Sequence, residues 1–177
     1  HNMMRRLIAV HHPEYLAAMS ELVLEKTGLL PHSNPGVMGM EDLRRLRETN
    51  VSVGLMLESA SPRLLRPGGA HWKAPDKVPS LRIRTIENAG QVSMAFTTGI
   101  LIGIGETLEE RVDALLAIRS AHQKYGHIQE VIVQPFRAKP DIRMALAPEP
   151  STDDLERTIA VARLILGGKM NIQSPPN

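Results

Sequence analysis

The sequence contains no cysteine, and this absence excludes two features from the chain. It can form no disulfide, and it can supply no thiolate ligand to an iron–sulfur cluster. Aromatic residues are also scarce, at 3% of 177 residues, and the basic residues are scattered along the chain. The pI of about 9.2 therefore does not indicate a nucleic-acid partner, because nucleic-acid-binding surfaces gather basic and stacking side chains.

Long apolar runs are missing as well. No segment reaches the roughly 18 consecutive apolar residues of a membrane-spanning helix, and residues 1–6 lack the apolar centre of a secretory signal. We therefore expect a cytoplasmic protein with no membrane partner. The remaining composition, 42% hydrophobic and 23% charged residues with a net charge of +2, is ordinary for a globular domain long enough to bury a core.

Helical and strand-like periodicities alternate along the chain. They predict helices over 15–27, 40–49, 80–89, 108–124 and 153–166, and strands over 29–34, 51–58, 94–103, 128–136 and 170–173. Gly28, Gly90 and Gly126 are expected to end three of the helices, and Ser151 or Thr152 to cap the last one. The segment 61–79, rich in proline, glycine and lysine, is expected to be irregular.

Strands that alternate with helices in this way predict an α/β fold with a parallel sheet. No nucleotide-fold glycine fingerprint interrupts the pattern, so a (β/α) TIM-type barrel is favoured over a doubly wound sheet. Because five strands cannot close an eight-stranded barrel, we expect residues 1–177 to form a single partial barrel domain of about five strand–helix units. The chain is then an internal fragment that covers the middle and later part of a larger barrel, without its first strands.

Polar residues stand at the expected carboxyl ends of these strands, where such barrels bind ligands. Glu58 ends an apolar run, and a buried carboxylate is costly without a partner. In the segment Gly-Ile-Leu-Ile-Gly-Ile-Gly-Glu, Gly99 and Gly103 let a ligand approach the backbone, and Glu106 can cap the next helix or bind a polar ligand edge. Arg137 suits an anionic group. The other candidates are His32, Asn34, Thr97, Thr98, Gln134, Asn171 and Gln173.

Structural explanations stay open for several of these residues. His32 can satisfy a loop carbonyl, and Thr97 and Thr98 are ordinary β-branched strand residues. A glycine-bearing buried strand explains Gly99 and Gly103 without any ligand.

A series of segments in the same order resembles one family. They are Pro75-Asp76-Lys77 and the segments 27–36, 54–58, 82–86, 96–107, 127–134, 136–140 and 171–177. The family is that of the radical S-adenosylmethionine (SAM) 7,8-didemethyl-8-hydroxy-5-deazariboflavin synthases, the cyclising module in coenzyme F-420 biosynthesis. The resemblance covers nearly the whole chain from about Tyr15 onward.

This resemblance implies a radical-SAM barrel that binds SAM and a 4Fe-4S cluster. The family holds the cluster on a CxxxCxxC loop after its first strand, and this loop is absent here, so these 177 residues alone are expected to be inactive. The resemblance implies that Glu58 contacts the SAM ribose hydroxyls. The residues that match the family's adenine site are Gly99, Gly103, Glu106, Val133 and Gln134.

The implied activity is that of a lyase. Reductive cleavage of SAM gives a 5′-deoxyadenosyl radical, which abstracts hydrogen from an adduct of a tyrosine-derived 4-hydroxybenzyl group and 5-amino-6-ribitylaminouracil, and ring closure expels ammonia. The implied residues on the substrate side are His32, Asn34, Thr97, Thr98, Arg137 and Gln173. No catalytic residue and no metal ligand is assigned within this chain.

The sequence departs from the family pattern at a few positions. Pro135 stands where the family usually has asparagine, and proline removes a backbone donor. Trp72-Lys73-Ala74 replaces Tyr-Gly-Ser, although Trp72 can still supply an aromatic wall. These changes affect the expected substrate contacts more than the expected SAM site.

Three other interpretations stay open. The first is a sister radical-SAM module, which joins tyrosine to 5-amino-6-ribitylaminouracil and is also a candidate partner, or a related barrel of menaquinone synthesis. The second is a cluster-free, non-catalytic barrel protein, which would explain the missing cysteines. The third is an aldolase-like barrel with Lys77 or Lys139 as a Schiff-base lysine, but neither lies within an expected strand.

Overall fold

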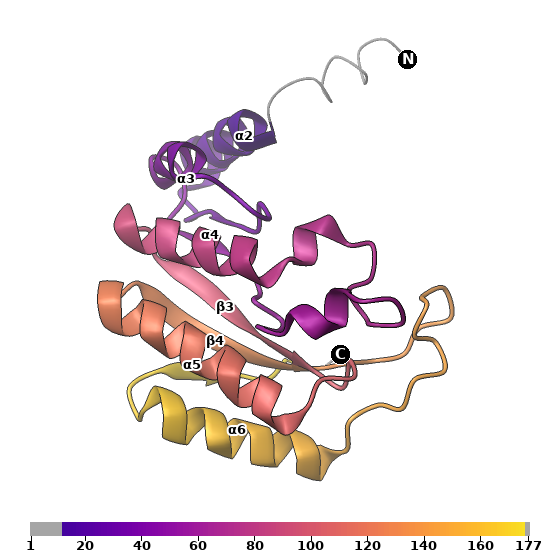
Figure 1. The fold of residues 1–177 in the computed structure, drawn as a ribbon. Helices are drawn as coiled ribbons and strands as arrows, with labels where there is room; N and C mark the ends of the chain where they lie inside the picture. Colours follow the sequence, from indigo (N-terminus) through magenta and orange to yellow (C-terminus); the bar gives the residue numbers. More distant parts are fainter. Residues whose placement is uncertain (1–11, 176–177) are drawn as a thin grey trace.

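The computed structural model describes residues 12–175 and contains one parallel sheet covered by helices (Figure 1). The strands are β1 (His32–Ser33), β2 (Ser52–Gly54), β3 (Phe96–Ile102), β4 (Ile128–Pro135) and β5 (Asn171–Gln173). They lie in the order β1-β2-β3-β4-β5, and every neighbouring pair is parallel. A doubly wound sheet reverses its strand order at one point, whereas this order never reverses. The predicted α/β fold of the barrel type is confirmed.

The helices alternate with the strands along the chain. They are α2 (His12–Thr27), α3 (Met40–Arg47), α4 (Pro79–Gln91), α5 (Leu108–Tyr125) and α6 (Thr152–Leu166), with two short 3₁₀ helices, η1 (Pro62–Leu65) and η2 (Pro75–Lys77), in the segment expected to be irregular. Consecutive helices pack side by side, from α2 at the top of Figure 1 to α6 at the bottom. This succession is the one that a right-handed β–α winding produces.

The core lies between the sheet and these helices. On β3, the side chains of Phe96, Thr98, Ile100 and Ile102 are all buried, whereas Thr97 and Leu101 on the opposite face are only half-buried. The alternation has a period of two because successive side chains of a strand point to opposite faces. We call the second face, which carries Thr97 and Leu101, the inner face of the sheet.

Local signals at most helix ends act as expected. Gly28 and Gly126 adopt positive φ angles of 69° and 66° directly after α2 and α5, a conformation that glycine adopts at low cost. The Ser151 side chain accepts a hydrogen bond from the backbone N–H of Asp154 and caps α6. The expected stop at Gly90 is wrong, because α4 continues to Gln91.

Strand β2 is shorter than expected, and the reason lies in the backbone. The expected strand 51–58 pairs regularly only from Ser52 to Gly54. The chain then leaves the ladder and touches β3 again through one bridge between Glu58 and Ile100. Glu58 has a φ of 63°, in the left-handed region that a strand cannot contain.

No helix among residues 12–175 has both the length and the apolar composition that crossing a bilayer requires. The cytoplasmic location and the extent of the domain stay predictions. The expectation about a signal in residues 1–6, and the last two residues of the matched segment 171–177, lie outside the described residues.

Candidate functional site

Strand pairing gathers most of the polar candidates on the inner face. His32 pairs with Ser52, Gly54 with Thr97, and Thr97 with Glu130. Glu130 in turn pairs with Asn171. Paired residues of parallel strands share a face, so one row of positions crosses the sheet from Gly54 on β2 to Asn171 on β5, and the His32–Ser52 pair lies two residues earlier on the same face.

Glu58 lies further along the strands than this row, level with Ile100 on β3. Basic side chains of this chain surround it. Its Oε2 accepts from His71 Nε2 at 2.9 Å, and its Oε1 accepts from Lys77 Nζ at 2.5 Å and from Arg82 Nη1 at 3.2 Å. The side chains of His71 and Arg82 are nearly fully buried. Three donors thus occupy the carboxylate, and Oε2 retains one acceptor position, since a carboxylate offers about four.

The Glu58 carboxylate is ionised throughout the neutral range. Burial raises its pKa, but the hydrogen bonds from His71 and Lys77 and the charges of Lys77 and Arg82 outweigh this effect and lower the pKa to about 2. Arg82 is itself held by the backbone carbonyls of Met56 and Asp76. The buried Glu58 carboxylate therefore has the partners that its burial requires, and they are three side chains.

The Glu106 carboxylate also accepts three hydrogen bonds, but two of its donors are backbone N–H groups. Its two oxygens accept from the backbone N–H groups of Gly103 and Ile104 at 2.9 and 2.8 Å, and Arg111 Nε donates at 2.7 Å. Its side chain is 2% exposed. Glu106 thus holds the turn after β3, and the expectation that it caps the next helix is wrong. The Thr107 side chain caps α5.

Arg111 extends this network from α5 to α6. Its guanidinium donates to both oxygens of Asp154 at 2.7 and 3.0 Å and to Thr158 Oγ1 at 2.9 Å. One arginine therefore joins the turn after β3 to two helices, which fixes that turn at the edge of the site.

Packing accounts for the glycines of the β3 segment. A Cβ atom at Gly99 would lie 2.1 Å from the carbonyl oxygen of Ile132 on β4, and one at Gly103 would lie 2.6 Å from Pro150 Cδ. Gly103 also has a φ of 85°. The structural explanation that the sequence left open is sufficient for both glycines, and close approach of a ligand to them stays a prediction.

Two candidates lie on the wrong face of the sheet. Thr98 is fully buried under the helices, and its Oγ1 accepts from the backbone N–H of Leu57. Val133 is fully buried in the same core. Its two neighbours in the chain, Ile132 and Gln134, are the residues that lie on the inner face. Neither side chain can touch a ligand on the inner face, so the predicted substrate contact of the Thr98 side chain is wrong. A contact of the Val133 backbone with the adenine stays a prediction.

His32 and Asn34 meet over the backbone of Gly54. A Cβ atom at Gly54 would lie 2.3 Å from Asn34 Oδ1 and 3.1 Å from His32 Nε2. His32 Nδ1 lies 2.7 Å from Ser52 Oγ, so a hydroxyl, and not a loop carbonyl, is its partner. Gly54 provides space for two exposed polar side chains at the β1 side of the inner face.

Gln134 lines a slot of about 270 Å³ at the ends of β3 and β4, together with Leu101, Pro135, Phe136, Arg137 and Lys139. Arg137 is exposed and pairs with Glu149, whose Oε2 lies 2.6 Å from Arg137 Nη1. An anionic ligand would have to displace Glu149 from Arg137.

The sequence interpretation missed Glu130. It is half-buried on the inner face, and the Gln173 amide nitrogen, turned towards it, lies 3.1 Å from both carboxylate oxygens. The signal in the sequence was a carboxylate two residues into an expected strand, and its register with Thr97 is a finding of the structure.

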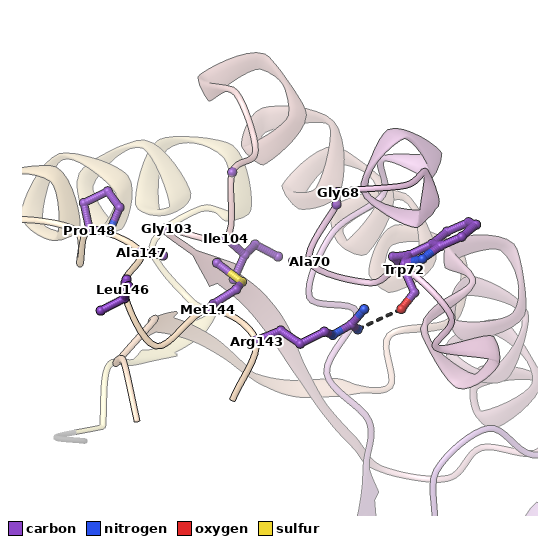
Figure 2. Close-up of a pocket in the computed structure, with 12 residues that line it drawn as sticks. Gly68, Ala70, Trp72, Gly103, Ile104, Arg143, Met144, Leu146, Ala147 and Pro148 are labelled. Atoms are coloured by element: carbon purple, nitrogen blue, oxygen red, sulfur yellow. Dashed lines mark hydrogen bonds between the residues drawn. The ribbon is translucent and has the colours of Figure 1, made fainter. Parts of the chain in front are cut away.

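A larger cavity of about 630 Å³ lies beside the turn after β3. Figure 2 shows Ile104 and Met144 next to each other within it and the ring of Trp72 directed away from them. Arg143 Nη2 donates to the Trp72 carbonyl at 2.7 Å and joins the two loops. The expected aromatic wall from Trp72 does not face Ile104.

Sequence comparison finds close relatives. The chain is 54% identical over 164 residues to the FO synthase of Mycobacterium tuberculosis, covering 92% of this chain and 19% of that protein. It is 55% identical over 164 residues to the 7,8-didemethyl-8-hydroxy-5-deazariboflavin synthase of Methanococcus maripaludis, covering 93% of this chain and 46% of that one. The resemblance to deazaflavin synthases is confirmed. The chain spans about a fifth of the first relative and less than half of the second. No protein-family model matches the sequence.

Solved structures agree on the fold. The crystal structure of methylornithine synthase (PylB) matches with a TM-score of 0.70 at 20% identity, over 90% of this chain and 44% of that one. The [FeFe]-hydrogenase maturase HydG matches with a TM-score of 0.74 at 16% identity, over 87% of this chain and 36% of that one. At such identities the likeness concerns the fold alone. It supports the barrel interpretation of the deazaflavin synthase resemblance.

Proposed function

We propose that this chain is part of a radical-SAM deazaflavin synthase. The complete protein forms the 5-deazaflavin ring of the coenzyme F-420 chromophore by hydrogen abstraction and cyclisation with loss of ammonia. The observation that carries this proposal is the 55% identity over 93% of the chain to the synthase of Methanococcus maripaludis. That relative is named for the cyclising reaction, which favours this activity over the sister module.

The residues present fit SAM at two places. Glu58 is ionised and retains an acceptor position on Oε2, which suits a ribose hydroxyl. The slot beside Leu101, Gln134 and Phe136 lies between two strand ends and suits a planar base such as adenine. Bound SAM would supply the radical that removes hydrogen from the substrate.

The 4Fe-4S cluster does not fit this chain on its own. The sequence has no thiolate, and among residues 12–175 no group of three histidine, aspartate or glutamate side chains comes together as a metal site. Cluster ligands would have to come from another part of the protein, and no step assigned to this chain depends on them.

In this proposal, the residues of this chain bind SAM and orient it. His71, Lys77 and Arg82 keep Glu58 charged and fix its direction, so that it acts as an acceptor without reorganisation. Glu106 holds the turn beside the base without contacting it. Val133 contributes its backbone only.

The substrate is the adduct of a 4-hydroxybenzyl group and 5-amino-6-ribitylaminouracil, and it lies on the inner face. The residues that bind it there are His32, Asn34, Thr97 and Gln173, and Arg137 stands at the rim. Thr98 leaves this set because it is buried under the helices.

The test is made on the full-length protein that carries this chain, with its cluster reconstituted without oxygen. We expect 5′-deoxyadenosine and a fluorescent deazaflavin when SAM, reductant and the adduct are supplied. Glu58→Gln should weaken SAM binding by about tenfold, the effect of one charged hydrogen bond, and Glu156→Gln, on the exposed face of α6, should not. Cleavage of SAM without deazaflavin would assign another radical-SAM reaction, and failure to bind SAM would overturn the class.

A further inference from the structure

Glu130 differs from the other carboxylates that line the site. Among residues 12–175 no lysine, arginine or histidine forms an ion pair with it, whereas Glu58 has Lys77 and Arg82 and Glu106 has Arg111. The partner that it does have, the amide of Gln173, is neutral. A half-buried carboxylate with one neutral partner keeps unused acceptor positions, and in a barrel interior these need donors.

The surface beside Glu130 is low and flat. In the row across the sheet, the neighbouring positions are Thr97, which is small, and Gly54, where Asn34 excludes any side chain. Strands lie about 4.8 Å apart, so Glu130 and Gly54 are separated by about 10 Å. A planar ring can lie on this floor, with Glu130 at one edge and Asn34 at the other.

Glu130 also lies at a different height from the slot proposed for adenine. It precedes Gln134 by four positions on β4, which corresponds to about 13 Å along a strand. A ligand at Glu130 therefore leaves the Gln134 slot free, and both ligands face the same side of β4.

We propose that Glu130 recognises the N1–C6 edge of the uracil ring of the substrate. In 5-amino-6-ribitylaminouracil, the ring N1–H stands next to the exocyclic N–H on C6, and this pair matches the two oxygens of a carboxylate, as the parallel donors of arginine do. In the adduct, C5 carries both the amino and the benzyl group, so the same edge is an amidine, which presents both N–H groups when it is protonated. Gln173 then turns its amide to the neighbouring ring carbonyl. This assignment deepens the proposed function and rests on it.

The experiment measures binding of 5-amino-6-ribitylaminouracil and of its 1-methyl analogue to the full-length protein. Glu130→Gln should weaken binding of the uracil by about tenfold or more. Glu130→Asp should recover part of this loss, and Glu156→Gln should have no effect. Removing the N1–H from the ligand should weaken binding to the unaltered protein and cause little further loss in Glu130→Gln, because both changes remove the same contact.

SAM cleavage in the absence of the uracil separates this assignment from the proposed function. It should be unchanged in Glu130→Gln. Equal uracil binding by the unaltered protein and Glu130→Gln would overturn the assignment, as would equal losses for both ligands accompanied by lost SAM cleavage, which indicate a structural role. If the unaltered protein binds the uracil through Glu130 but never cleaves SAM, the radical-SAM function fails and the uracil site stands.

Discussion

Lys77 Nζ lies 2.5 Å from Glu58 Oε1, on a carboxylate that Arg82 and His71 already contact. The residue that we propose binds the ribose is therefore held in position before any ligand arrives. Its backbone is also in the left-handed region, at a φ of 63°, and strain of this kind is common where a fold holds a functional side chain. The hydrogen bonds to Gly99 and Leu101 on β3 keep it there.

The pKa of Glu58 predicts a loss of stability in acid. Its value is about 2 in the folded chain, against 4.5 ordinarily. A lowered pKa stabilises the folded state above the unfolded-state value, and this contribution disappears as the pH falls from about 4.5 to about 2. The difference corresponds to about 3 kcal/mol. Urea unfolding of the unaltered chain and of Glu58→Gln at pH 7 and pH 3 should show a smaller pH effect in the variant. Parallel pH curves would contradict this.

Removing the cations of Glu58 one at a time should have unequal effects. Arg82→Met should destabilise the fold by about 3 kcal/mol, because it leaves a buried carboxylate with a missing partner. Lys77→Met should cost about 1 kcal/mol, since Lys77 is 30% exposed and solvent can replace it. Denaturant midpoints of both variants test the order. A larger effect at Lys77 would show that Arg82 is not the main partner.

Arg111 should be a structural link between the β3 turn and the two helices. Arg111→Met leaves Glu106 buried without its cation and frees Asp154, and we expect a loss of about 3 kcal/mol. Arg119→Met, an exposed position on the same helix, is the control and should change stability by less than about 0.5 kcal/mol. Similar unfolding midpoints for the two variants would refute the link.

Gly99 and Gly168 should respond differently to the same substitution. An alanine Cβ at Gly99 would meet the Ile132 carbonyl at 2.1 Å, whereas nothing lies within 4 Å of one at Gly168. Gly99→Ala should force β3 and β4 apart at a cost of about 3 kcal/mol, and Gly168→Ala should be tolerated. Thermal unfolding compares the two. A stable Gly99→Ala variant would mean that the strands separate easily.

Hydrophobic periodicity was sufficient to predict the strand order and the helices, because five β–α repeats leave little choice of topology. It could not predict which face each strand residue takes. In β4, Val131, Ile132 and Val133 form an unbroken apolar run, which suits either face. The register also shifts between Phe96 and Thr97, where Glu130 and not Gln129 becomes the partner of Thr97. The sequence therefore could not show that the Val133 side chain is buried in the core.

The contacts of the site lie beyond periodicity for a different reason. The cage around Glu58 joins residues 13 to 24 positions apart, and it depends on the irregular segment between β2 and α4. The role of Glu106 needed the direction of the Gly103 and Ile104 N–H groups, which only the turn geometry defines. Glu130 was missed because an acidic residue early in a strand resembles an exposed position.

The most direct test of the central claim is hydrogen transfer in the full-length protein. The adduct is supplied with deuterium at every C–H position of its 4-hydroxybenzyl unit, and the 5′-deoxyadenosine formed is analysed by mass spectrometry. The account predicts one deuterium in 5′-deoxyadenosine together with formation of the deazaflavin. A deazaflavin formed without 5′-deoxyadenosine would contradict the radical mechanism and the role that we give to Glu58.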